Sequence, residues 1–169
     1  MVFPERFSDL PAATWPRLRA LLDVPTQASE TINMTIGEPR HAFPDFVGAI
    51  LAANQQGFAK YPDNYGVADL LDAISGFLGR RYGLDIPHEQ IITLNGTREG
   101  LYNAAMALCP EHKNGKPVIL TPNPFYQVYA VAAISVGAEA IYVPATEATG
   151  LQPDFHALSE DVLNRTAIA

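Results

Sequence analysis

The stretch IITLNGTREGL at residues 91–101 places a strand pattern, a tight turn and a helix start in direct succession. Apolar and β-branched residues predict a strand over 90–94, and Gly96 marks the turn that follows it. A helix is then expected from about Thr97 to Leu108. The first N–H groups of a helix are unpaired and lie at the positive end of its dipole, so this turn can hold a phosphate group. The turn can equally be structural, with Thr97 as an ordinary helix cap.

Outward from this stretch, strand and helix patterns alternate along the chain. Apolar alternation and short buried-type runs predict strands over 32–36, 118–121 and 141–143. Apolar residues at three- and four-residue steps predict helices over 8–22, 46–54, 67–82, 126–136 and 154–163, the third ending at Gly83 and the last starting near Asp154. Helices between strands imply crossover connections, so we expect an α/β fold with a mostly parallel sheet flanked by helices.

The last residues, 166–169, have the pattern of a further strand that is just beginning. A natural domain seldom ends inside a strand that would lie in the middle of a sheet, because unpaired backbone groups would be left at its edge. We therefore expect the chain to be truncated.

The composition disfavours two classes of partner. The 169 residues carry a formal net charge of −7 without any lysine- and arginine-rich run, so neither nucleic acid nor a membrane is an expected partner. Cys109 is the single cysteine, and the N-terminus lacks a signal-peptide pattern, which favours a cytoplasmic location. The histidines are scattered without metal-ligand spacing, so no metal site is expected.

A second segment with potential chemistry is TPNPFYQVY at residues 121–129. It follows a predicted strand directly, and ligands of open α/β sheets bind beyond the carboxyl ends of the strands. Its prolines stiffen the loop, and an aromatic ring there can stack on a planar heteroaromatic cofactor. The alternative is that Phe125, Tyr126 and Tyr129 are aromatic residues of the core.

Four motifs, taken together in their order and spacing, resemble the class I and II aminotransferases, which have the pyridoxal-phosphate (PLP) fold of type I. The motifs are IGEP at 36–39, YP at 61–62 with Gly66, NGTRE at 95–99 and PFYQVY at 124–129. The stretches most similar to the succinyldiaminopimelate aminotransferase branch are IGEPRH at 36–41, RRYGL at 80–84 and NGTRE. By this resemblance, residues 1–40 would form an N-terminal arm and small-domain segment. Residues 41–169 would form the first part of the PLP-binding large domain.

The resemblance also implies a role for each matching residue of the second half. Gly96, Thr97 and Arg98 would wrap the phosphate of PLP, mainly through backbone N–H groups. Tyr126 would stack on the pyridine ring, with Phe125 as the second candidate.

Two residues of the first half receive roles in the same way. Tyr61 would reach across a homodimer interface to the phosphate held by the other subunit, and Gly37 would lie in the mobile segment that closes over the substrate carboxylate. The alternatives are a tyrosine that packs locally and a plain turn glycine.

The parent enzyme would transfer an amino group between an amino acid and a 2-oxo acid, with PLP on a Schiff-base lysine. The resemblance places that lysine beyond Ala169, and Lys60, Lys113 and Lys116 lack its Ser-x-x-Lys context. We therefore expect no catalytic residue in the chain, no transamination by these residues alone, and a cofactor that is absent or held non-covalently. The alternative hypothesis is a non-catalytic α/β module that binds a phosphorylated ligand or a protein partner.

Overall fold

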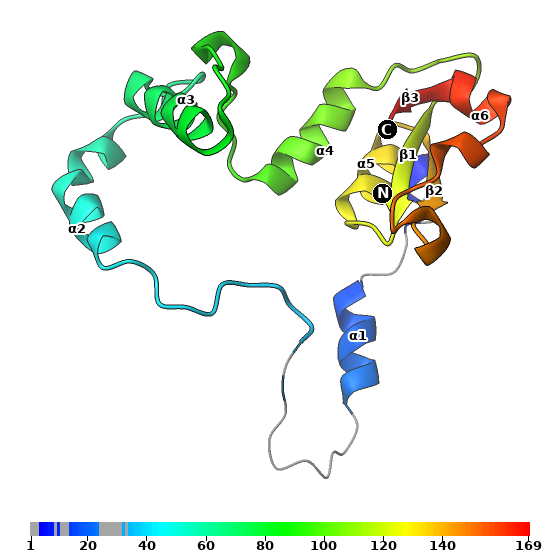
Figure 1. Cartoon of the computed structure of the whole chain (residues 1–169), viewed down its shortest axis with the longest axis horizontal. Helices are drawn as coiled ribbons and strands as arrows, with labels where there is room; N and C mark the ends of the chain where they lie inside the picture. Colours follow the sequence, from blue (N-terminus) through cyan, green and yellow to red (C-terminus); the bar gives the residue numbers. More distant parts are fainter. Residues whose placement is uncertain (1–3, 9, 11–13, 24–31, 33) are drawn as a thin grey trace. The chain divides into compact units, whose positions relative to one another are not determined.

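A computed structural model describes residues 4–8, 10, 14–23, 32 and 34–169. Its packing divides the chain into two units, one of residues 1–12 and 94–169 and the other of residues 13–93 (Figure 1). We describe each unit by itself. The boundary expected at residue 40 falls elsewhere than this division and stays a prediction.

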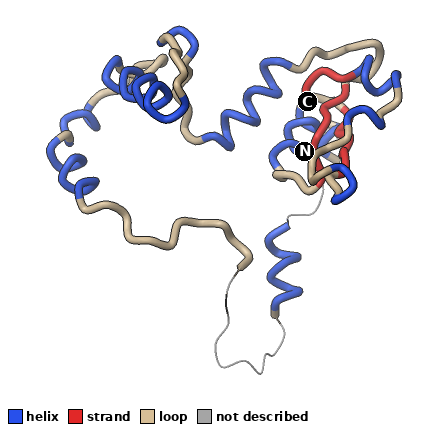
Figure 2. Tube along the Cα trace, in the orientation of Figure 1, coloured by secondary structure: helices blue, strands red, loops and turns tan. Residues whose placement is uncertain are grey.

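The strands of the described residues all belong to the unit that contains residues 94–169 (Figure 2). Strand β1 (Val118–Asn123) lies between β2 (Glu139–Pro144) and β3 (Thr166–Ile168). Both pairings are parallel, with Val118 opposite Glu139 on one side and Thr166 on the other. The predicted parallel sheet is therefore confirmed, and so is the strand expected at 166–169.

Helices cover both faces of this sheet, because its apolar side chains alternate between the faces. Ile119 packs with Ala132 and Ala133 of α5 (Val128–Ser135) and with Ala105 of α4 (Thr97–Leu108). Val118, Leu120 and Val143 form the core on the opposite face, where Val162 of α6 (Glu160–Arg165) packs against them. Three layers result, and they confirm the predicted flanking of the sheet by helices.

The unit of residues 13–93 consists of helices and loops in its described part (Figure 2). Gly83 ends its longest helix in the left-handed conformation, with φ 69°, as the sequence predicts. Leu71 on that helix is the unit's buried hydrophobic residue among those described. The helices are α1 (Thr14–Leu22), α2 (Phe46–Ala53) and α3 (Ala68–Tyr82), with 3₁₀ turns η2 (Gln55–Ala59) and η3 (His88–Gln90).

Two expected strands are not formed. Residues 91–94 follow η3 without entering a sheet, and the described residues among 32–36 are outside any strand. A strand needs a partner for its backbone N–H and C=O groups. Within the described residues no partner strand pairs with either segment.

The single helix expected over 154–163 is also wrong. Asp154 does cap a helical turn, since its carboxylate accepts the N–H of His156 at 3.1 Å, but that turn is the short η5 (Phe155–Ala157). Ser159 then starts α6 as a second N-cap and accepts the N–H of Val162 at 3.4 Å. The serine competes with the helix backbone for hydrogen bonds and so divides the helix. The remaining 3₁₀ turns are η1 (Glu5–Phe7) and η4 (Glu147–Thr149).

Candidate functional site

The first turn of α4 is open to solvent and has no side-chain cap. Gly96 is its N-cap residue, with φ 109° and ψ 146°, a conformation that glycine adopts and other residues adopt only under strain. A Cβ atom at this position would have no neighbour within 4 Å, so the space beside the backbone is free. Thr97 is the first helical residue and supplies no capping hydrogen bond, which contradicts the interpretation of Thr97 as a cap.

This geometry suits an anion. The N–H groups of Thr97, Arg98 and Glu99 precede the first intrahelical bond, which runs from the Gly100 N–H to the Gly96 carbonyl at 3.2 Å. Residues 95–99 are all exposed, so a ligand can reach these N–H groups. The helix dipole adds a partial positive charge at the same place.

The two candidate aromatic residues of the second segment have different partners. The Phe125 ring packs on Tyr142 of β2, with ring centroids 4.7 Å apart. The Tyr126 ring instead meets Tyr129 edge-on at 6.0 Å, and the guanidinium carbon of Arg98 lies 5.7 Å from its centroid. The structure therefore brings Tyr126, and not Phe125, next to a residue of the α4 start.

A shallow depression lies where the first turns of α4 and α5 meet. Its polar lining comes from Asn95, Arg98, Glu99 and Gln127, with the half-buried Tyr102 beside them. Four of these residues, Asn95, Glu99, Tyr102 and Gln127, were not expected at the site. The turn signal around Gly96 could have indicated Asn95, but Tyr102 and Gln127 are brought in by the packing of α4 on α5.

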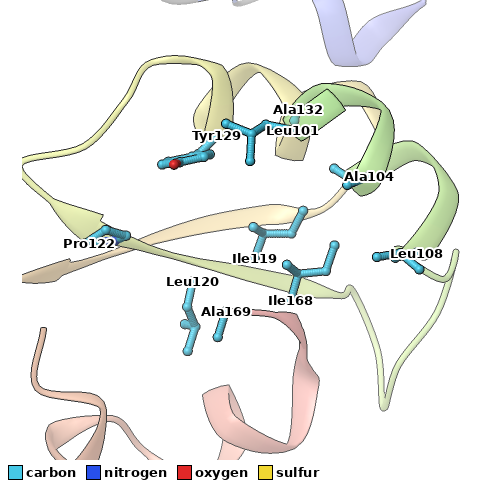
Figure 3. Close-up of a pocket in the computed structure, with 11 residues that line it drawn as sticks. Leu101, Ala104, Leu108, Ile119, Leu120, Pro122, Tyr129, Ala132, Ile168 and Ala169 are labelled. Atoms are coloured by element: carbon cyan, nitrogen blue, oxygen red, sulfur yellow. The ribbon is translucent and has the colours of Figure 1, made fainter. Parts of the chain in front are cut away.

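A second cavity in this unit, of about 310 Å³, has a different chemistry. It lies between α4, α5 and the sheet, where Leu101 and Leu108 face Ile119 and Ile168 (Figure 3). Its lining is almost wholly apolar, and the Tyr129 side chain supplies its one hydroxyl. A phosphorylated ligand would leave charge unpaired there, so this cavity is not the candidate site.

Tyr61 and Gly37 belong to the unit of residues 13–93, so the structure describes them separately from Gly96, Arg98 and Tyr126. Tyr61 is fully exposed at the start of a turn that Asp63 holds by accepting the Tyr65 N–H at 2.9 Å. The turn ends at Gly66, where a Cβ would approach Thr93 Cγ2 to 2.6 Å. Gly37 is exposed, and a Cβ there would have no neighbour within 4 Å.

The lysines of the sheet-containing unit lie at the wrong end for chemistry at this site. Lys113 and Lys116 are exposed and precede β1, whereas the Tyr126 loop follows it.

Among the described residues, no group of three or more potential ligands could hold a metal ion. The described helices are also too short or too polar to cross a membrane.

One buried polar atom was not expected from the sequence. The hydroxyl of Thr121 in β1 is buried and has no hydrogen-bond partner. Strand alternation places its side chain on the same face as Ile119, toward α4 and α5. A threonine inside an apolar strand gives no sequence signal for such an unpaired hydroxyl.

Known proteins are similar to the chain in both sequence and fold. The family model of aminotransferase class I and II matches residues 29–168. An LL-diaminopimelate aminotransferase from Syntrophobacter fumaroxidans is 29% identical over 97% of the chain and 42% of the relative.

Solved structures agree with the sequence match. An aminotransferase from Neisseria meningitidis superposes with a TM-score of 0.86 at 30% identity, over 96% of this chain and 42% of that one. An aminotransferase AspB from Helicobacter pylori gives 0.79 at 30% identity, over 92% and 40%. The chain thus spans less than half the length of these relatives. Because the family model covers most of its residues, the chain belongs to the class I and II aminotransferases.

Proposed function

We propose that the chain is the N-terminal part of a PLP-dependent enzyme that transfers an amino group between an amino acid and a 2-oxo acid. The observation that carries the proposal is the uncapped α4 start at Gly96, with Arg98 and Tyr126 beside it. The family match over residues 29–168 supports it independently.

The residues present fit PLP. The free space beside Gly96 admits a phosphate, and the N–H groups of Thr97 and Arg98 would donate to it. The Tyr126 ring, 41% exposed, would lie against the pyridine ring. When bound, the cofactor supplies an electron sink that no protein side chain provides.

Three further roles belong to the proposal. Tyr61 would contact the phosphate held by the second subunit of a homodimer, and its full exposure is compatible with that role. Gly37 would lie in the segment that closes over the substrate carboxylate. The single cysteine is compatible with a cytoplasmic location.

The chain by itself would not transaminate. Lys113 and Lys116 precede β1 and lie at the end of the strand away from Tyr126, and Lys60 lacks the Ser-x-x-Lys context that the resemblance implies. The lysine that binds PLP covalently would therefore come from outside these residues. The resemblance to the succinyldiaminopimelate branch stays a prediction beside the LL-diaminopimelate aminotransferases that match the sequence.

The test uses the whole protein that carries this chain. Purified with PLP, it should show a visible absorption band that borohydride removes, leaving the cofactor covalently attached to a lysine. Transfer from an amino acid to a 2-oxo acid should proceed in two separable half-reactions. A colourless protein in which borohydride attaches no cofactor would contradict the proposal.

The alternative is a non-catalytic module that binds a phosphorylated ligand. The helix start alone would serve this module as well, since the phosphate contacts are the same, but the Tyr126 ring beside it and the family match favour the enzyme. The borohydride experiment separates the two. Only the module would bind a phosphorylated ligand without any covalent attachment in the whole protein.

A further inference from the structure

The contact between Arg98 and Tyr126 joins the two elements that form the candidate site. Arg98 is the second residue of α4, and Tyr126 lies in the loop between β1 and α5. The distance of 5.7 Å between the guanidinium carbon and the ring centroid lies within the range of about 6 Å over which cations attract aromatic faces.

The Tyr126 ring has a second aromatic contact and a partly exposed surface. Tyr129 meets it edge-on at an interplanar angle of 90°, which fixes one edge of the ring. Within the described part of the chain, the Tyr126 hydroxyl makes no hydrogen bond, and Arg98 takes part in no ion pair. Tyr129 and the Arg98 guanidinium are the two ring contacts of Tyr126 among the described residues.

We propose that the Arg98 side chain is a positioning residue, which holds the Tyr126 ring at a fixed place beside the α4 start. This inference rests on the proposed function, because the ring is the surface on which the cofactor would stack. Backbone N–H groups of α4 would bind the phosphate, while the Arg98 side chain orients the platform for the pyridine ring. One residue would thus couple the two halves of the cofactor site.

The competing explanation is that the guanidinium itself binds the phosphate and contacts the ring only incidentally. The two explanations differ in what happens when Tyr126 is removed. A positioning role disappears with the ring, whereas a direct contact to phosphate remains.

The first experiment needs no ligand. The chain is labelled with 3-fluorotyrosine, and the fluorine resonance of Tyr126, one of seven tyrosines, is assigned by its loss in Tyr126→Phe. Arg98→Gln should shift this resonance, and Arg98→Lys should restore part of the shift because an ammonium group also attracts the ring. Arg81→Gln is the matched control, since Arg81 is exposed in the last turn of α3. A Tyr126 resonance that is the same in Arg98→Gln and in the control overturns the positioning role.

The second experiment uses pyridoxine 5′-phosphate, which has no aldehyde and so forms no Schiff bases with surface lysines. Arg98→Gln should weaken its binding to the whole protein that carries this chain about two- to five-fold, the size of an exposed cation–π contact. The same substitution in a Tyr126→Ala background should have an effect at least about two-fold smaller. Equal losses in both backgrounds would show direct contact with the phosphate and overturn the inference.

The two experiments separate this inference from the proposed function. If the whole protein that carries the unaltered chain does not bind pyridoxine 5′-phosphate, the proposed cofactor site fails, whatever the fluorine spectra show. If the whole protein binds it and the Tyr126 resonance is unchanged in Arg98→Gln, the cofactor site stands and the positioning role fails.

Discussion

At the scale of single residues, Gly96 connects backbone conformation with ligand binding. Its φ of 109° lies where a side chain clashes with its own backbone, so the strain is intrinsic and does not depend on neighbours. A Cβ atom at this position would have no neighbouring residue within 4 Å, so crowding by other residues is not the source of the strain. Glycine is therefore needed at position 96 for the backbone conformation of the helix start, and not because neighbouring atoms leave no room for a side chain.

Replacing Gly96 with alanine is expected to lower the free energy of unfolding by about 1–3 kcal/mol, the cost of a side chain in this backbone region. It should also weaken binding of pyridoxine 5′-phosphate, because a relaxed backbone would redirect the N–H groups. Urea unfolding and equilibrium titration measure the two effects. Gly57→Ala is the control, since Gly57 has free space and no positive φ, and it should be close to neutral. Equal effects of the two substitutions would contradict the expectation.

Thr121 gives a prediction of opposite sign. Its buried hydroxyl has no partner, so Thr121→Val removes an unpaired polar group while keeping the shape of the side chain. We expect the free energy of unfolding of the chain to rise by about 1 kcal/mol. Thr166→Val is the matched control, because the Thr166 hydroxyl donates to the Val162 carbonyl at 2.8 Å and its loss should destabilise. A destabilised Thr121→Val variant would indicate a hydrogen-bond partner for the hydroxyl.

At the scale of elements, Arg165 fixes the place where α6 passes into β3. Its guanidinium donates to Glu139 at 2.9 Å, to Asp161 at 3.0 Å and to the carbonyl of Lys116 at 3.0 Å. Glu139 begins β2, and Lys116 precedes β1, so one side chain ties the amino ends of all three strands. The hydrogen bonds to Glu139 and then to Asp161 raise the pKa of Arg165.

We expect Glu139→Gln to lower the thermal midpoint of the chain more than Asp161→Asn does. The Glu139 carboxylate is 45% exposed and joins two strands, whereas Asp161 is 74% exposed and pairs within its own helix. Solvent screens the second pair more strongly. Thermal unfolding followed by circular dichroism gives the order, and adding salt should reduce the difference between the variants. The reverse order would contradict this account of the sheet edge.

The success of sequence-based prediction follows the range of the interactions. Local signals identified α4 at both ends and the C-terminal glycine of α3, because helix bonds and caps lie within a few residues. The 90–94 segment was wrong, since a strand depends on a distant partner that its own pattern does not contain.

The candidate site divides in the same way. The turn at Gly96 and the aromatic loop were predicted from motifs. The contact of Arg98 with Tyr126, and the turning of Phe125 toward Tyr142, depend on how α4 and β2 pack around that loop. The residue pattern and the motif spacing of the sequence do not predict how these elements pack.

At the scale of the whole molecule, the buried core is unevenly distributed. Within the described residues, Leu71 is the buried hydrophobic residue of the 13–93 unit, and the others belong to the unit with the sheet. Apolar burial is the main source of folding free energy, so the two units should differ in local stability.

Hydrogen exchange of the chain measures this difference directly. Amides of β1 and α5 should exchange at least about 100-fold more slowly than those of α2, after correction for intrinsic rates, because about 1.4 kcal/mol of opening free energy gives each factor of ten. Helix α2 is the sharpest comparison, since its apolar residues Phe46, Ile50 and Leu51 are more than half exposed and contribute little to its protection. Similar protection in α2 and β1 would mean that α2 is buried in the chain in solution. A large difference would instead assign the stable core to the unit that contains Gly96 and Tyr126, so that the candidate cofactor site is built on the most rigid part of the chain.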